Sequence, residues 1–235
     1  MLPETMPVCP VRGSVIYPTM VMPIDAGRPI SIRAIDEALA RDRVLLIVSQ
    51  RDKEVETPRP SDLFEVGTAC NILKMRKNPD GSVQVLVQAF ARVRVREWLD
   101  LGDHLEARGE VLADEPGEPI LVKALVREVK DKFQALLKEG KYLAPEVAQF
   151  ILNLEDPSQL ADYVAFHMDL RLEDKQKVLE TANVAERLRA VLVLLEAELA
   201  LIETQRRIQQ QVKEEIDRNQ REYFLREQMK AIQRE

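Results

Sequence analysis

Apolar and polar residues alternate in short runs along the first half of the chain, a pattern that predicts β-strands. The clearest pair is residues 66–77 and 82–98, joined by Asn-Pro-Asp-Gly-Ser, which is typical of a hairpin turn. Proline cannot donate a hydrogen bond to a neighbouring strand, so the prolines within the earliest runs place those runs at sheet edges or bends. The shorter apolar runs predict further strands at residues 8–11, 15–24, 44–48 and 104–113.

One helix is expected among these strands. Residues 28–40 space Ile32, Ile35 and Leu39 at helical intervals, with Ser31 as the predicted N-cap. Several strands with a single helix predict a small, partly closed antiparallel barrel, which we assign to residues 1–116.

Helical periodicity takes over in the second half of the chain. Ten of the 13 prolines lie at or before Pro116, and the last glycine is Gly140. Because glycine and proline break helices, the chain changes there from turn-rich to helical. We therefore expect an α+β fold, with an all-helical lobe over residues 117–202. Its first four helices should begin near Pro119, Pro145, Asp156 and Leu172.

The last helix should begin near Val184 and continue to the end of the chain, since residues 184–235 contain no glycine or proline. At about 1.5 Å per residue it would be about 75 Å long, so it must project from the body. The face expected to pack on the second lobe consists of Leu188, Val191, Leu195, Leu199 and Ile202.

Residues 203–235 form the extension of this helix, and its apolar stripe narrows to Ile208, Val212 and Ile216 among charged and amide side chains. A narrow stripe with flanking charges is typical of a coiled-coil seam, but a solvated helical arm fits equally well.

Large apolar residues return close to the C-terminal end, at Tyr223, Phe224, Leu225 and Met229. The helical pattern then stops at Ile-Gln-Arg-Glu without a C-cap. We therefore expect this sequence to be a fragment of a longer protein.

Composition excludes a disordered chain, because 46% of residues are hydrophobic and the 31% that are charged are nearly balanced. Forty acidic residues against 34 basic residues give a net charge of −6, distributed evenly along the sequence. This balance argues against a dedicated nucleic-acid-binding protein.

Targeting signals are absent from the sequence. No apolar run approaches the roughly 20 residues of a membrane-spanning helix, and no secretory signal precedes residue 30. Cys9 and Cys70 fit two buried thiols in a reducing compartment, although one disulfide would also account for both. We therefore expect a cytoplasmic protein with no membrane partner.

Catalytic motifs are absent as well: the sequence has no phosphate-binding loop, no GxGxxG, no CxxC and no HExxH. His104 and His167 lie far apart in the sequence and are expected to be structural. We expect no enzyme activity, no metal site and no cofactor in this chain.

The candidate binding surface comes from apolar residues that break the strand pattern. Odd positions of residues 83–95 form one apolar face, so Leu86 and Phe90 should lie among polar residues on the other face. If exposed, these residues would form an adaptable surface for apolar peptide segments. If not, the 28–40 helix or the second lobe covers them. Residues 20–24 are apolar on both faces and, together with the nearby Tyr17, they add the candidates Tyr17, Met20, Met22, Pro23 and Ile24.

Alternating arginines suggest a different function. Arg92, Arg94 and Arg96 would share one face of a strand, where their guanidinium groups suit phosphate, as in an RNA-binding β-barrel module. A half-solvated sheet face gives the same pattern. A stand-alone coiled-coil adaptor is a further alternative.

Four segments, in order, resemble the N-terminal region of the Lon family of ATP-dependent proteases. Residues 6–23 carry an apolar-Pro-apolar-Arg motif followed by Tyr-Pro and Met-Pro, and residues 27–35 resemble the Gly-Arg and helix that follow. Residues 79–95 resemble the family hairpin, and residues 221–233 resemble the segment before the ATPase module.

The resemblance implies a PUA-like barrel and a non-catalytic region that recognises unfolded or degron-tagged proteins. It also implies that six subunits of an ATP-dependent serine protease assemble, so the partners would be protein substrates and other subunits, without nucleic acid. ATP, magnesium and the catalytic Ser–Lys pair would belong to later segments. The candidate inter-subunit residues on the arm are Ile208, Val212, Ile216, Tyr223, Phe224 and Met229.

Overall fold

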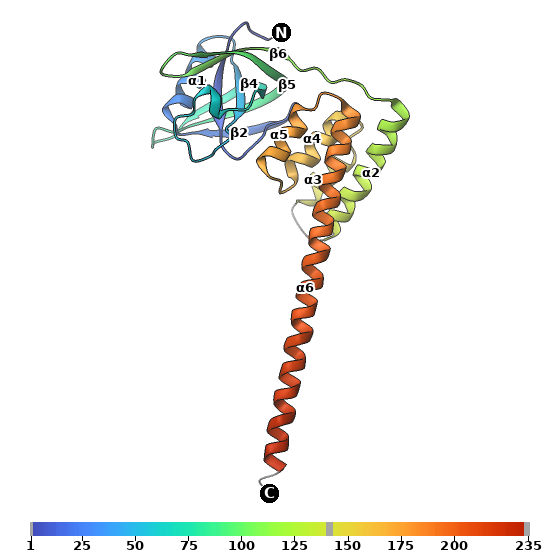
Figure 1. Cartoon of the computed structure of the whole chain (residues 1–235). Coiled ribbons are helices and arrows are strands. Elements are labelled where there is room, and N and C mark those ends of the chain that lie inside the picture. Colours follow the sequence, from blue (N-terminus) through green and yellow to red (C-terminus); the bar gives the residue numbers. More distant parts are fainter. Residues whose placement is uncertain (1, 140–142, 233–235) are drawn as a thin grey trace.

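The computed structural model describes residues 2–139 and 143–232 and consists of a β-lobe, a helical lobe and one long helix. In Figure 1 the β-lobe lies beside the upper end of the helical lobe, and the long helix runs far beyond both. The predicted absence of a C-cap concerns residues 233–235, which lie outside the described residues.

The β-lobe is a curled six-stranded sheet with the order β2-β5-β4-β3-β1-β6, and an additional β5–β6 pairing closes five strands into a barrel. β2 pairs with the first part of β5 and β6 with its last part, so β2 remains attached outside the ring. This arrangement confirms the predicted barrel and hairpin. The elements are β1 (Met6–Val11), β2 (Val21–Ala26), α1 (Pro29–Ala40), β3 (Val44–Ser49), a short 3₁₀ turn (Pro60–Asp62), β4 (Val66–Lys77), β5 (Val83–Asp100) and β6 (Leu105–Val111).

β1 differs from the prediction in two respects. It pairs in parallel with β3, so the barrel is not wholly antiparallel, and it lies between β3 and β6 rather than at an edge. Its prolines are tolerated because the two neighbours cover different stretches: β6 pairs at Met6–Val8 and β3 at Val8–Val11. Pro7 and Pro10 therefore each face only one partner strand.

A register shift at Phe90 changes the predicted apolar face of β5. Opposite Ala69 and Cys70, β5 contains one extra residue, which makes a β-bulge between Ala89 and Ala91. Val83 to Ala89 consequently pack in one core with α1, whereas Val93 and Val95 belong to a second core with β1, β3 and β6. The prediction that the odd positions of residues 83–95 form one apolar face is therefore wrong.

The helical lobe follows the predicted order, with proline at the first turn of three helices. Asp156 caps α4 by accepting hydrogen bonds from the backbone N–H groups of Ser158 and Gln159. α1 has no such cap, and its predicted cap Ser31 is instead buried within the first turn. The helices are α2 (Pro119–Lys138), α3 (Pro145–Leu152), α4 (Pro157–His167), α5 (Leu172–Glu180) and α6 (Val184–Ile232).

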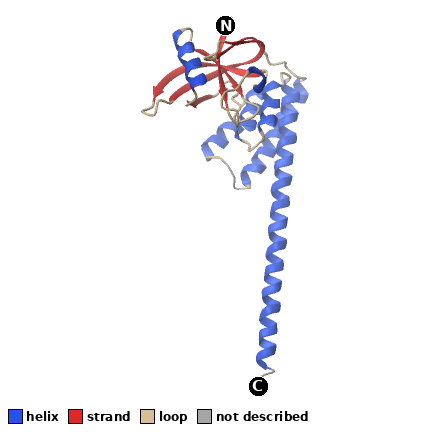
Figure 2. Ribbon diagram, turned by 60° about the vertical axis from the view of Figure 1, so that its left-hand side comes forward, coloured by secondary structure: helices blue, strands red, loops and turns tan. Residues whose placement is uncertain are grey.

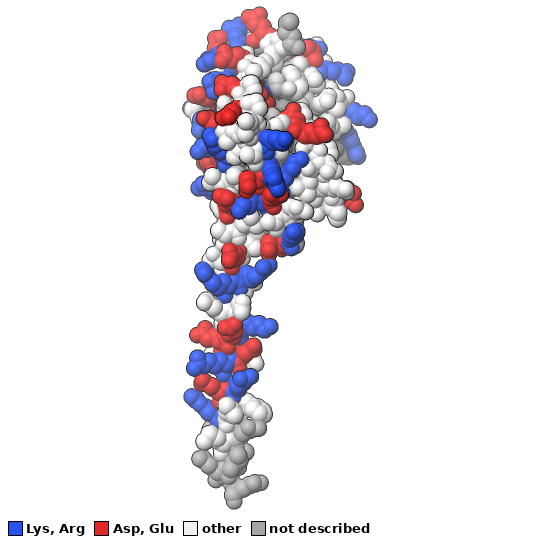
Figure 3. Space-filling model, turned by 90° about the vertical axis from the view of Figure 1, so that its right-hand side faces the viewer, with Lys and Arg blue, Asp and Glu red and all other residues white. Residues whose placement is uncertain are grey.

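α6 confirms both halves of its prediction. Its first turns pack between the other helices, where Leu188, Val191 and Leu195 are buried, and the remainder leaves the body as a single straight rod (Figure 2). Lysine, arginine, aspartate and glutamate side chains of both signs follow one another down this rod (Figure 3). The 49-residue helix is about 74 Å long at the usual rise.

Candidate functional site

Tyr17 and Met20, two of the predicted binding residues, lie in the junction between the lobes. Tyr17 is 0% exposed and Met20 4%, and both belong to the core cluster that contains the helices. The Tyr17 hydroxyl donates to the backbone oxygen of Lys175 on α5, at 2.8 Å. The expectation that these two residues are exposed is wrong, because the helical lobe covers the loop before β2.

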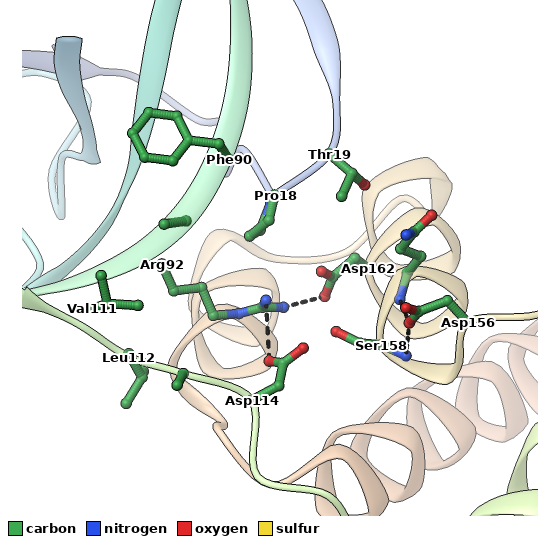
Figure 4. Close-up of a pocket in the computed structure, with 13 residues that line it drawn as sticks. Pro18, Thr19, Phe90, Arg92, Val111, Leu112, Asp114, Asp156, Ser158 and Asp162 are labelled. Carbon is green, nitrogen blue, oxygen red and sulfur yellow. Dashed lines mark hydrogen bonds and ion pairs between the residues drawn. The ribbon is translucent and has the colours of Figure 1, made fainter. Parts of the chain in front are cut away.

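Arg92 lies at the same junction and is not available to a phosphate. Its guanidinium donates to Asp162 on α4 at 2.5 Å and to the backbone oxygen of Leu179 at 3.1 Å, and Asp114 lies 3.5 Å away (Figure 4). Arg92 is buried, so its charge is neutralised inside the protein. The three arginines therefore do not share one solvent-exposed face. This removes the main support for an RNA-binding strand.

Arg187 at the start of α6 completes this cluster. It is fully buried and donates to Asp114 at 2.7 Å, to Ser158 at 2.6 Å and to the backbone oxygen of Thr181. Burial raises the pKa of Asp162 to about 6, although Arg92 and Arg187 act in the opposite direction. No sequence pattern points to this cluster, because its members are brought together only by the tertiary fold.

A pocket of about 250 Å³ opens beside these charges. Figure 4 shows Phe90 at one end of it, with Pro18 and Thr19 above the Arg92–Asp162 pair and Val111 opposite. Phe90 is 37% exposed, so of the two alternatives for this side chain the exposed one holds. The bulge places it at the lobe junction, away from the other candidates on β2.

The remaining candidates gather around β2, the edge strand. Pro23 pairs with Leu86 of β5, and directly paired residues share a face of the sheet, so these two side chains point to one side. Val21, 53% exposed, lies two residues away on that side. Met22 and Ile24 point to the other side, where both are half-buried and line a hollow of about 430 Å³.

We call these five residues, Val21, Met22, Pro23, Ile24 and Leu86, the β2 surface. Alternating side chains usually give an edge strand one apolar face, whereas β2 is apolar on both. The sequence identified four of the five residues, and Val21 could have been found from its position between two candidates.

The candidates on the arm are all exposed. Ile208, Val212 and Ile216 are each roughly half exposed, and Tyr223, Phe224 and Met229 more than half. Ion pairs join the base of α6 to α2, through Lys132 with Glu196 and Glu139 with Arg206.

Other groups that carry chemistry have structural roles. His104 is buried between Asp103 at 2.6 Å and Glu106 at 3.3 Å. Cys9 and Cys70 are free, buried thiols, and burial raises the pKa of Cys9 to about 11. Among residues 2–139 and 143–232, no group of three or more His, Cys, Asp or Glu side chains could hold a metal ion. The described helices include none that is long and apolar enough to span a membrane.

Taken together, the fold is a barrel joined to a helix bundle, with apolar side chains exposed on an edge strand and on a helical arm. Residues 5–197 match the family model described as the ATP-dependent protease La (LON) substrate-binding domain. The chain therefore belongs to the Lon substrate-binding domain family.

Relatives and solved structures agree with this assignment. The chain is 41% identical over 229 residues to the Lon protease of Escherichia coli (strain K12), and 38% identical over 230 residues to that of Brevibacillus choshinensis. These alignments cover 97% and 98% of this chain but only 29% and 30% of the relatives. The structure of the N-terminal domain of Mycobacterium avium complex Lon protease superposes with a TM-score of 0.68 and 27% identity, covering 82% of this chain and 98% of that one.

Proposed function

We propose that this chain captures unfolded or degron-tagged proteins for an ATP-dependent protease and that the β2 surface makes the contact. The observation that carries the proposal is an edge strand whose side chains are apolar on both faces and remain accessible. Exposed apolar groups of this kind are frequent at protein-binding sites. Methionine suits such a surface because its flexible side chain adapts to different partners.

Capture should occur through side chains rather than by strand addition. The backbone N–H of Ala89 donates to Met20, so the alternation of the ladder directs the N–H groups of Met22 and Ile24 toward β5. Pro23 then faces the free edge, where it has no N–H to offer an incoming strand. Binding by a few side chains without backbone hydrogen bonds would be weak and tolerant of sequence.

The test is binding of a reduced and alkylated protein, which cannot refold, in parallel with its native form. Replacing both Met22 and Ile24 by serine should weaken binding of the unfolded form about tenfold, or about 1.4 kcal/mol. Binding of the native form should be undetectable throughout. Fluorescence anisotropy with labelled protein would give the dissociation constants.

Val193 and Ile120 provide a matched control, because both are highly exposed aliphatic residues on the helical lobe. The double serine variant at these positions should bind unfolded protein as the unchanged chain does. If both double variants lose affinity equally, general surface hydrophobicity explains the binding. If neither does, the β2 surface is not the site.

We also propose that the arm pairs with the arm of another subunit and so supports assembly. Ile208, Val212 and Ile216 repeat every four residues, which places them along one side of the helix. The ion pairs between α6 and α2 in the described chain end at Arg206, so the stripe begins where α6 leaves the body. Pairing of two such stripes would bury apolar surface that is otherwise in contact with water.

Sedimentation equilibrium of the chain over a range of concentrations tests this pairing. Replacing the three stripe residues by lysine should abolish association and leave the melting temperature of the body unchanged. The control adds the same three units of charge on the opposite side of the helix, as Glu203→Gln, Gln210→Lys and Glu214→Gln. Equal association of the two triple variants would exclude the stripe as the contact.

A further inference from the structure

A second hollow, of about 490 Å³, lies where the second half of β5 and the start of β4 meet the end of α5. It is distinct from the β2 surface and shares no residue with it. Three arginines contribute to its wall together with one aromatic ring and two carboxylates. The lining residues are Arg51, Phe64, Glu65, Val66, Arg94, Arg96 and Glu180.

Arg51 is held in a defined orientation. The centre of its guanidinium lies 4.4 Å from the centroid of the Phe64 ring, and its Nε donates to the backbone oxygen of Leu63 at 3.0 Å. A stacked guanidinium with one hydrogen bond made loses little further freedom when its remaining N–H groups bind an anion. Arg51 is therefore a preorganised donor.

Arg94 is the less usual member of the group. It is half-buried on β5, in register with Val66 on one side and Glu110 on the other. Among the described residues, none makes a hydrogen bond or ion pair with its side chain, whereas Arg96 bonds to Glu110. A partly desolvated guanidinium with five free donors favours an anionic acceptor.

Arg51 and Arg94 are the guanidinium groups in the hollow that remain available to a small anion. Arg96 is already paired with Glu110, and Glu180 already accepts a hydrogen bond from Gln176 at 2.8 Å. We propose that this hollow binds a phosphoryl-type dianion, held by Arg51 and Arg94 with Arg96 at its rim. A tetrahedral dianion can accept bonds from several guanidinium groups at once, which a single carboxylate cannot do as well.

The position of the hollow gives such binding a consequence. Arg94 and Val66 belong to the β-lobe and Glu180 to the helical lobe, so an anion there would lie against both. Because the helical-lobe residue in the wall is the Glu180 carboxylate, Arg51 and Arg94 must outweigh its repulsion of the anion. This inference does not depend on substrate capture by the β2 surface.

The experiment is a titration of the chain with inorganic phosphate at constant ionic strength, followed by backbone amide shifts. We expect saturable shifts on both sides of the hollow, near Arg94 and near Glu180. Acetate at the same ionic strength should bind at least several-fold more weakly. Arg94→Gln should weaken phosphate binding about tenfold or more, as loss of a charge-assisted contact does.

Arg127→Gln is the matched control, because this exposed arginine lies on α2, remote in sequence from every lining residue. It should bind phosphate as the unchanged chain does. Arg51→Gln offers a second test in case the β5 substitution disturbs folding, and thermal melting would detect that disturbance. Unsaturated shifts, equal binding of acetate, or unchanged affinity in both Arg51→Gln and Arg94→Gln would overturn the proposal.

Discussion

The apolar segment before and within β2 has two different environments. Val15, Tyr17 and Met20 are buried in the core shared by the two lobes, whereas Val21, the next residue, is 53% exposed. The composition of the two parts is similar, so local sequence does not decide between them. The deciding element is the helical lobe, more than 100 residues later, which covers the loop and leaves the edge strand uncovered.

Substitution at the junction should have the largest effect. Asp162→Ala removes the carboxylate that faces Arg92 and Arg187 and leaves two buried guanidinium groups with less compensation. Breaking a buried ion pair from one side costs about 3–5 kcal/mol. Urea denaturation at neutral pH, above the pKa of about 6 that burial gives Asp162, would measure the loss.

Asp25→Ala is the matched control on the edge strand. The Asp25 carboxylate is exposed and accepts one hydrogen bond, from Gln84 at 2.8 Å. Its removal should change the free energy of unfolding by less than about 0.5 kcal/mol. Similar losses for the two variants would mean that the junction cluster contributes no more than a surface contact.

Alanine substitution at Met20, compared with Met22, should give the second largest loss in the free energy of unfolding. Met20→Ala removes a buried side chain from the shared core and should cost about 2–4 kcal/mol. Met22→Ala, in a half-buried position beside an open hollow, should cost about 1 kcal/mol or less. The two unfolding curves should therefore separate clearly, and equal midpoints would show that β2 is as well covered as the loop before it.

Elements that depend on local pattern could be predicted from the sequence. The β4–β5 hairpin follows from its turn residues, and the helix starts follow from proline in the first turn. The buried stripe of α6 follows from the spacing of Leu188, Val191 and Leu195. These features need only neighbouring residues to be specified.

Features that depend on distant contacts could not be predicted. From the sequence alone, Arg92 is expected on the solvent-exposed face of a strand. In the structure it is buried and pairs with Asp162, which lies 70 positions later. The bulge at Phe90 leaves no mark in the hydrophobic pattern, although it moves Val93 and Val95 into another core. Of the seven candidate binding residues, the helical lobe buries two, Tyr17 and Met20, and the other five are exposed or half-buried.

Tyr17→Phe should have a smaller effect than the two preceding junction variants. The ring remains to fill the core, but the backbone oxygen of Lys175 loses the hydrogen bond that it accepts at 2.8 Å. Loss of one partly buried hydrogen bond costs about 0.5–1.5 kcal/mol. Amide hydrogen exchange along α5 should accelerate if this bond joins the lobes, and unchanged exchange there would assign the bond no such role.

Pro23→Val should have the smallest effect on stability. It tests whether Pro23 is the reason that no further strand pairs with the free edge of β2. Valine favours strands and restores an N–H on the free edge of β2, so the free energy of unfolding should change by less than about 1 kcal/mol. The free edge would then offer a complete set of hydrogen-bonding groups to another strand, which promotes edge-to-edge association.

Light scattering should detect concentration-dependent dimers of the valine variant. The control, Pro23→Ser combined with Val21→Lys, should stay monomeric because a charge protects the edge. Because both variants restore the N–H, a monomeric valine variant would show that the twist of β2, rather than its proline, prevents strand addition.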